Sequence, residues 1–81
     1  MKYRSRTEII SNILRAALDG PCTKTRLMYR AYVSSEQINE YLGNLLSNEL
    51  MIKEQYMYSL TEKGMQFLRL SKTMSELAPT I

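Results

Sequence analysis

Two apolar patterns of helical spacing, separated by only three residues, constrain the fold of this chain most. The first pattern lies within residues 24–31 and the second within residues 35–47. Thr23 is suited to cap the first helix, because its hydroxyl can accept a free backbone N–H. Ser34, followed three residues later by Gln37, fits a capping box at the start of the second. The apolar positions of the two patterns are Leu27, Met28, Ala31, Ile38, Tyr41, Leu42, Leu45 and Leu46. The short gap is typical of a helix-turn-helix.

A third helical pattern precedes this pair. It predicts a helix over about residues 6–19, which Ser5 or Thr7 can cap and which Gly20-Pro21 ends. A short extended piece at Pro21-Cys22 then leads to Thr23. We expect Cys22 to be a small buried apolar residue.

Residues after the pair predict a hairpin and a last helix. The hairpin combines residues 50–54 with residues 57–60, and Gln55-Tyr56 forms its tip. Thr61 can cap a helix that runs to about residue 77. The predicted fold class is therefore mostly α with a small β-hairpin. We expect a single domain over residues 1–81, with a core at about 5–60 and a C-terminal helix at about 61–77.

The order of these elements is that of a winged helix-turn-helix. Three helices form the core, the hairpin covers its open end, and the third helix keeps one exposed face. Such a face can enter a major groove about 12 Å wide.

Composition excludes several classes of protein. The chain has 81 residues with no His and one Cys, so an internal disulfide and a thiolate zinc cage are ruled out. It shows no glycine-rich phosphate loop and no nucleophile–base pair, so we expect no enzyme, no cofactor and no metal. No apolar run approaches the roughly 20 residues of a bilayer span, and no signal peptide is evident. We expect a soluble cytoplasmic protein without membrane contact.

Positive charge is concentrated in the first part of the chain. Residues 1–30 contain seven basic and two acidic side chains, a net +5, whereas residues 31–81 contain four basic and six acidic ones, a net −2. A basic half favours a polyanionic partner, because Lys and Arg displace counterions from phosphates. The alternative is a basic surface that meets only solvent.

Three stretches resemble a family of small archaeal winged-helix proteins. TKTRLMYRA at residues 23–31 is similar to the family's second helix, and this motif is fairly specific. INEYL at residues 38–42, with Leu45, Leu46 and Leu50, is similar to its third helix and the following strand. YSLTEKG at residues 58–64 resembles the closing strand and helix start of many winged helices. The resemblance covers about residues 4–72 and implies DNA binding by a homodimer, which several members build through a C-terminal antiparallel coiled coil.

The chain departs from that family in two respects. Its last helix is short for such a coiled coil. Its third helix carries Glu36 and Glu40 but neither Lys nor Arg.

The predicted DNA contacts fall into two groups. Polar side chains of the third helix suit base edges, and the candidate readers are Ser35, Gln37, Asn39 and Asn44. The alternative is a polar face that meets only solvent. Cations around this helix suit phosphates, and the candidates are Lys24, Arg26, Arg30, Arg4, Arg6 and Lys53. Arg4 and Arg6 would form a basic arm that reaches a minor groove, or else a frayed terminus.

Apolar residues of the last helix predict a dimer contact. Their spacing of three, four and three residues forms a narrow stripe typical of a helix pair, at Phe67, Leu70, Met74 and Leu77. The stripe could instead fold back on the protein's own first helix. We favour a two-fold dimer.

Tyrosines are numerous for a chain of this length. We expect Tyr41 and Tyr58 at the edge of the core, with the hydroxyl reaching water, and Tyr29, Tyr32 and Tyr56 on the surface.

The sequence thus indicates a homodimer that binds double-stranded DNA as a transcription regulator or a nucleoid-associated chromatin factor. The alternative is a winged helix that binds other proteins and not DNA, because a fold alone does not determine function.

Overall fold

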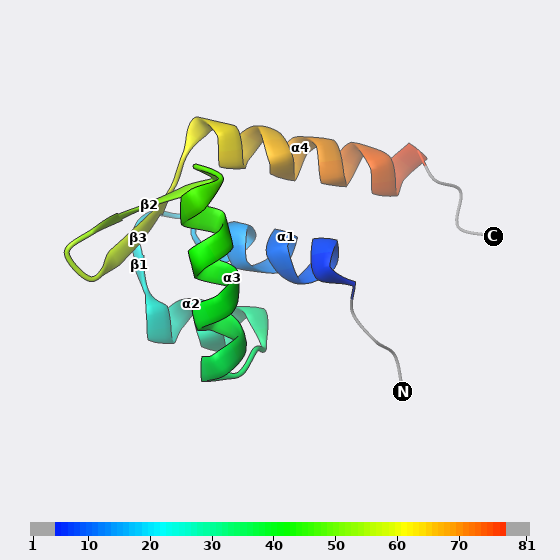
Figure 1. Cartoon of the computed structure of the whole chain (residues 1–81). Helices are drawn as coiled ribbons and strands as arrows, with labels where there is room; N and C mark the ends of the chain where they lie inside the picture. The colour runs from blue at the N-terminus through cyan, green and yellow to red at the C-terminus, as the bar shows by residue number, and fades with distance from the viewer. Residues whose placement is uncertain (1–4, 78–81) are drawn as a thin grey trace.

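The computed structural model describes the backbone of residues 5–77 and the side chains of residues 5–70. The chain forms α1 (Arg6–Ala16), β1 (Cys22–Thr23), α2 (Lys24–Ala31), α3 (Ser35–Ser47), β2 (Met51–Glu54), β3 (Met57–Leu60) and α4 (Glu62–Leu77), shown in Figure 1. The predicted class, mostly α with a small hairpin, is confirmed. The ends of α2 and α3 agree with the sequence patterns, whereas α1 stops at Ala16, three residues before the predicted end.

Side-chain oxygens cap the start of each helix, as the sequence predicts. Ser5 Oγ accepts from the Glu8 N–H at 3.1 Å, so Ser5 and not Thr7 caps α1. Thr23 caps α2 in the same way, with 3.2 Å between its oxygen and the Arg26 nitrogen. These bonds satisfy N–H groups that have no partner within the helix.

The hairpin belongs to a three-stranded antiparallel sheet with the order β1-β3-β2. β2 and β3 pair from Met51 opposite Leu60 to Glu54 opposite Met57. β1 adds to the other edge of β3, with Cys22 opposite Tyr58. In Figure 1 this sheet extends to the left of the helices, away from the start of α1 and the end of α4. β1 therefore ties the start of α2 to the wing.

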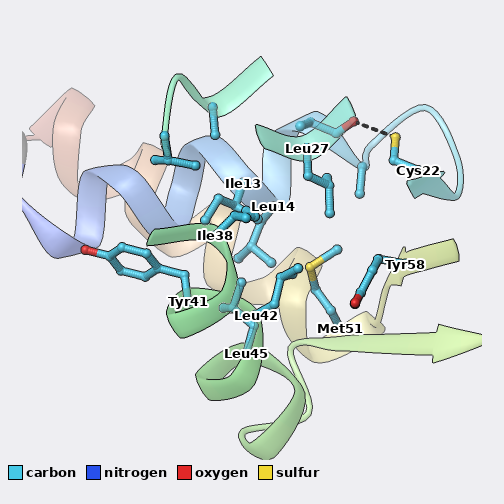
Figure 2. Close-up of a cluster of buried hydrophobic side chains, with 14 of the residues drawn as sticks. Ile13, Leu14, Cys22, Leu27, Ile38, Tyr41, Leu42, Leu45, Met51 and Tyr58 are labelled. Carbon is cyan, nitrogen blue, oxygen red and sulfur yellow. Dashed lines mark hydrogen bonds between the residues drawn. The ribbon is translucent and has the colours of Figure 1, made fainter. Parts of the chain in front are cut away.

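The core lies between α1, α2, α3 and the base of the sheet, and Figure 2 shows its side chains. Its largest fully buried side chains come from four elements and are Ile13, Leu14, Leu27, Ile38, Leu45 and Met51. Each such side chain contributes about 1.5–3 kcal/mol when it leaves water. The expected positions of the tyrosines are confirmed, since Tyr41 and Tyr58 are each 7% exposed and Tyr29, Tyr32 and Tyr56 lie on the surface.

The carbonyl oxygen of Ala16, at the end of α1, connects three elements. Like the other last carbonyls of a helix, it has no partner within the helix. It accepts from Cys22 Sγ at 3.3 Å, drawn as a dashed line in Figure 2, and from Arg30 Nη1 at 2.9 Å. Cys22 is buried, as predicted. These two bonds hold β1 and α2 against the end of α1.

α4 lies alongside α1 in Figure 1, and its apolar residues point in different directions. Phe67 and Leu68 are partly buried and pack against the core. Met65 is 39% exposed and Leu70 is 65% exposed. Phe67, the first residue of the predicted dimer stripe, thus packs against this chain's own core.

Gly64 is the glycine at which packing forbids a side chain. A Cβ built there would overlap the carbonyl oxygen of Leu50 and lie 2.8 Å from Leu60 Cδ1. That carbonyl also accepts from the Thr61 N–H, at 3.2 Å, so it cannot move freely. We expect Gly64→Ala to lower the free energy of unfolding by about 1–3 kcal/mol, the usual cost of overpacking. Urea denaturation followed by circular dichroism measures this change.

Gly43→Ala provides the matched control. Nothing lies within 4 Å of a Cβ at Gly43, which is exposed within α3. Since Gly in a helix interior costs about 0.5–1 kcal/mol relative to Ala, this variant should be more stable than the parent. Equal effects of the two substitutions would contradict this assignment.

Candidate nucleic-acid interface

α3 buries one side and exposes the other over its whole length. Ile38, Tyr41, Leu42 and Leu45 point into the core. The opposite side is exposed and consists of Ser35, Glu36, Gln37, Asn39, Glu40, Gly43, Asn44 and Ser47. We call this set the polar face of α3. Its outward orientation is the one that the sequence predicts.

The four predicted base readers do not lie together on this face. At about 100° per residue, Ser35 and Asn39 fall on one edge of it, while Gln37 and Asn44 fall on the other. Glu36 lies between the two edges. If side chains on both edges contacted bases at once, the Glu36 carboxylate would therefore face the DNA between them.

Gln37 has the structural role that the sequence predicts for it, as part of a capping box. Its Oε1 accepts from the Ser34 N–H at 3.0 Å, and its own N–H donates to Ser34 Oγ at 3.2 Å. This is the predicted capping box, which turns the Gln37 amide back toward the start of α3. The same side chain was predicted as a base reader, and the cap competes with that role.

Lys24 reaches the polar face from the first position of α2. Its Nζ donates to Asn39 Oδ1 at 2.9 Å, although the two residues are 15 apart in the sequence. Arg26 is exposed about half a turn further along α2, and within the described part of the chain its guanidinium makes no hydrogen bond or ion pair. The start of α2 thus places one cation, Lys24, on the Ser35–Asn39 edge, with the exposed Arg26 at the same end of the helix. No sequence signal predicts the Lys24–Asn39 pair, because it depends on how α2 and α3 pack.

Arg6 does not belong to an extended arm, contrary to the sequence prediction. It is the first residue of α1, and its Nη2 lies 4.0 Å from Glu40 Oε1. Its guanidinium carbon lies 5.6 Å from the centre of the Tyr41 ring. An exposed ion pair of this kind contributes little stability, but it places a cation beside Glu40. Arg4 lies outside the described residues.

The remaining two predicted phosphate ligands are held by contacts of their own. Arg30 is exposed, but its guanidinium is anchored to the Ala16 carbonyl. Lys53 lies on the wing, with its Nζ 5.6 Å from the centre of the Tyr58 ring. Tyr56 at the tip of the wing is largely exposed.

A groove of about 510 Å³ lies between α1 and α4, away from the polar face. Its lining residues are Arg15, Leu18, Met65, Leu68 and Arg69. Leu70 of α4 is exposed as well. Exposed apolar side chains thus occur both on α4 and just after the end of α1.

The described residues offer little for other kinds of site. Among them, no three His, Cys, Asp or Glu side chains are grouped so that they could hold a metal ion. A search of the same residues finds no helix with the length and hydropathy that crossing a membrane requires.

Two curated relatives come from the archaeon Methanocaldococcus jannaschii. The uncharacterized protein MJ0290 is 38% identical over 61 residues, which is 75% of this chain and 29% of that protein. The uncharacterized protein MJ0287 is 36% identical over 61 residues, 75% of this chain and 63% of that protein. The matched region thus spans less than two thirds of either relative.

Two solved structures share the fold. Sso10a-2, described as a DNA-binding protein from Sulfolobus solfataricus, superimposes with a TM-score of 0.70 at 25% identity, over 96% of this chain and all of that one. ZitR from Lactococcus lactis gives a TM-score of 0.73 at 21% identity, over 94% of this chain and 55% of that one, which is a likeness of fold.

A family model described as winged helix-turn-helix matches residues 3–79. With its exposed third helix, its three-stranded wing and this match over nearly the whole length, the chain belongs to the winged helix-turn-helix family.

Proposed function

We propose that this protein binds double-stranded DNA as a homodimer and acts in the cytoplasm as a transcription regulator or a nucleoid-associated chromatin factor. The observation that carries the proposal is the polar face of α3, which is exposed along its length and is contacted by the cations Lys24 and Arg6. The similarity to Sso10a-2, a DNA-binding protein, supports it.

In the proposed complex, α3 lies in the major groove. A helix with its side chains is about 10–12 Å across, which fits a groove about 12 Å wide. Lys24 and Arg26 would bind phosphates on one border of the groove. The N–H groups at the start of α2 point the same way and favour an anion. Base contacts would come first from Ser35 and Asn39, on the edge nearest these cations.

The acidic residues of α3 are compatible with this arrangement. Glu40 has Arg6 beside it, which offsets its charge near DNA. Glu36 is exposed and can accept from the amino group of cytosine. The carboxylates would thus restrict the sequences that bind.

The other residues predicted to contact DNA have smaller roles in the proposed complex. Asn44 lies on the far edge of the polar face, and Gln37 is turned into the capping box. Arg30 and Lys53 could contact phosphate only alongside the interactions that they already make.

Dimerisation through α4 is part of the same proposal. Leu70 is 65% exposed on α4, and Leu18 and Met65 line the groove between α1 and α4, so both places leave apolar side chains available to a partner. Met74 and Leu77 continue the predicted stripe, but their side chains lie outside the described residues. Two-fold pairing would place the two α3 helices on successive turns of one face of the duplex.

One observation favours a second candidate, a protein-interaction module. Glu36 stands near the middle of the polar face, and none of the described side chains forms an ion pair with it. A basic partner protein would suit that position. Retention on duplex DNA at low salt, lost as salt rises, distinguishes DNA binding from this alternative.

Arg26→Gln tests the phosphate contact. Loss of one such contact should weaken binding to all duplexes and reduce the slope of log K against log salt by about 0.9 per protomer. Fluorescence anisotropy with a labelled duplex, between about 50 and 200 mM salt, measures both quantities.

Arg69→Gln is the matched control, because it removes the same charge from the groove between α1 and α4. Its salt slope should stay at the parent value. If both variants reduce the slope of log K against log salt by the same amount, binding depends only on net charge and the proposed Arg26 contact is wrong.

Leu70→Glu tests the dimer. A buried Leu contributes about 1.5–3 kcal/mol, and a two-fold contact buries it twice, so the dimer should weaken on the order of a hundredfold or more. Analytical ultracentrifugation measures the dissociation constant.

Ile52→Glu, on the wing strand β2, is the matched control, since Ile52 is 48% exposed. It should leave the dimer intact. A parent protein that is monomeric at all concentrations, or a Leu70→Glu dimer of unchanged affinity, would refute dimerisation through α4.

A further inference from the structure

We infer that Lys24 determines which base α3 reads, because it converts Asn39 into part of a donor-only pair that selects guanine over adenine. The inference rests on the proposed function and goes beyond it by naming a base and the residue that selects it.

The two residues are held by elements that cannot easily shift. Lys24 opens α2, whose start is fixed by the Thr23 cap and whose Leu27 is fully buried. Asn39 follows Ile38, which is also fully buried. The 2.9 Å bond from Lys24 Nζ to Asn39 Oδ1 therefore joins two rigid helices and not two loops. The backbone positions of the two residues therefore stay fixed when a ligand arrives, which keeps the two side chains within reach of each other.

The chemistry of the pair fixes the orientation of the Asn39 amide. An ammonium can only donate, so the atom that faces Lys24 has to be the oxygen. The Asn39 NH₂ group then points away from Lys24. The ammonium keeps two further N–H donors. The Asn39 oxygen keeps a second lone pair, but a further donor would have to approach it beside the ammonium, so toward a base the pair acts mainly through its donors and positive charge.

Base edges respond differently to such a pair. A free Asn matches adenine, with its oxygen accepting from the adenine amino group and its NH₂ donating to N7. With Lys24 on that oxygen, the adenine amino group would meet an ammonium, and donor would face donor. Guanine offers two acceptors, N7 and O6, and satisfies both members of the pair. Cytosine presents an amino donor and is disfavoured for the same reason as adenine.

The phosphate contact proposed above for Lys24 would give no base preference by itself, and substitutions separate it from base selection. Lys24→Met keeps much of the side-chain length but removes every side-chain donor. The Asn39 oxygen is then free to accept a hydrogen bond from a base. Lys24→Arg keeps the charge and the donors. Arg26→Gln removes one charge from the same end of α2 without touching Asn39, and serves as the matched control.

The experiment selects bound duplexes from a random pool and then measures affinity for duplexes that carry each base at the selected position. The parent protein and Lys24→Arg should prefer guanine there, by on the order of tenfold over adenine. Lys24→Met should lose this preference or shift it to adenine. Asn39→Ala should abolish the preference. Adding Lys24→Met to Asn39→Ala should change base preference no further, since the two residues act as one unit. Arg26→Gln should bind all duplexes more weakly and still prefer guanine.

Three results would overturn the inference, and they differ in what else they imply. If Lys24→Met weakens all duplexes uniformly and keeps the guanine preference, Lys24 contacts only phosphate. If the parent binds duplex DNA without any base preference, DNA binding stands and the inference fails. If the parent binds no duplex at all, the proposed function fails as well. Thermal denaturation of each variant confirms that it is folded, which is expected because both side chains are exposed.

Discussion

Burial of the apolar side of α3 is the interaction on which the rest of the structure depends. Ile38 and Leu45 are fully buried together with Ile13 and Leu27 of the two preceding helices. Truncation of such a side chain costs about 2–5 kcal/mol, a large part of the roughly 5–15 kcal/mol that stabilises a domain. α3 therefore cannot rotate about its axis without losing the core. The polar face points outward because of what the opposite side has to bury.

The cations beside that face depend on a chain of contacts that begins at the end of α1. The Ala16 carbonyl accepts from Cys22 and Arg30, and so holds β1 and α2 in place. β1 pairs with β3, and Thr23 at its end caps α2. Lys24 follows directly and reaches Asn39. Arg30 thus has a structural role behind the proposed interface, while Lys24 lies on the polar face of α3 itself.

The sequence predicted the local features well, because local chemistry determines them. The bounds of α2 and α3, the Thr23 cap and the Ser34 capping box all follow from residues close in sequence. The early end of α1 was missed, since Ala17 and Leu18 continue the apolar spacing after the helix has stopped. The roles of polar side chains were predicted less well. Gln37 received two predicted roles, cap and base reader, and the structure shows its oxygen on the Ser34 N–H at the helix start. Arg6 and Lys24 meet α3 through tertiary packing, which helical spacing does not reveal. Phe67 illustrates the same limit, because its place in the stripe does not tell whether it packs on its own core.

The most direct test of the DNA interface is a titration of the isotope-labelled protein with a short duplex, followed by NMR of its backbone amides. We expect salt-sensitive shifts at residues 23–26 and 35–40, at the start of α2 and along the first half of α3. Amides that line the groove between α1 and α4 should stay unchanged. Shifts confined to α4, or a polar face of α3 that does not respond to the duplex, would contradict DNA binding through α3.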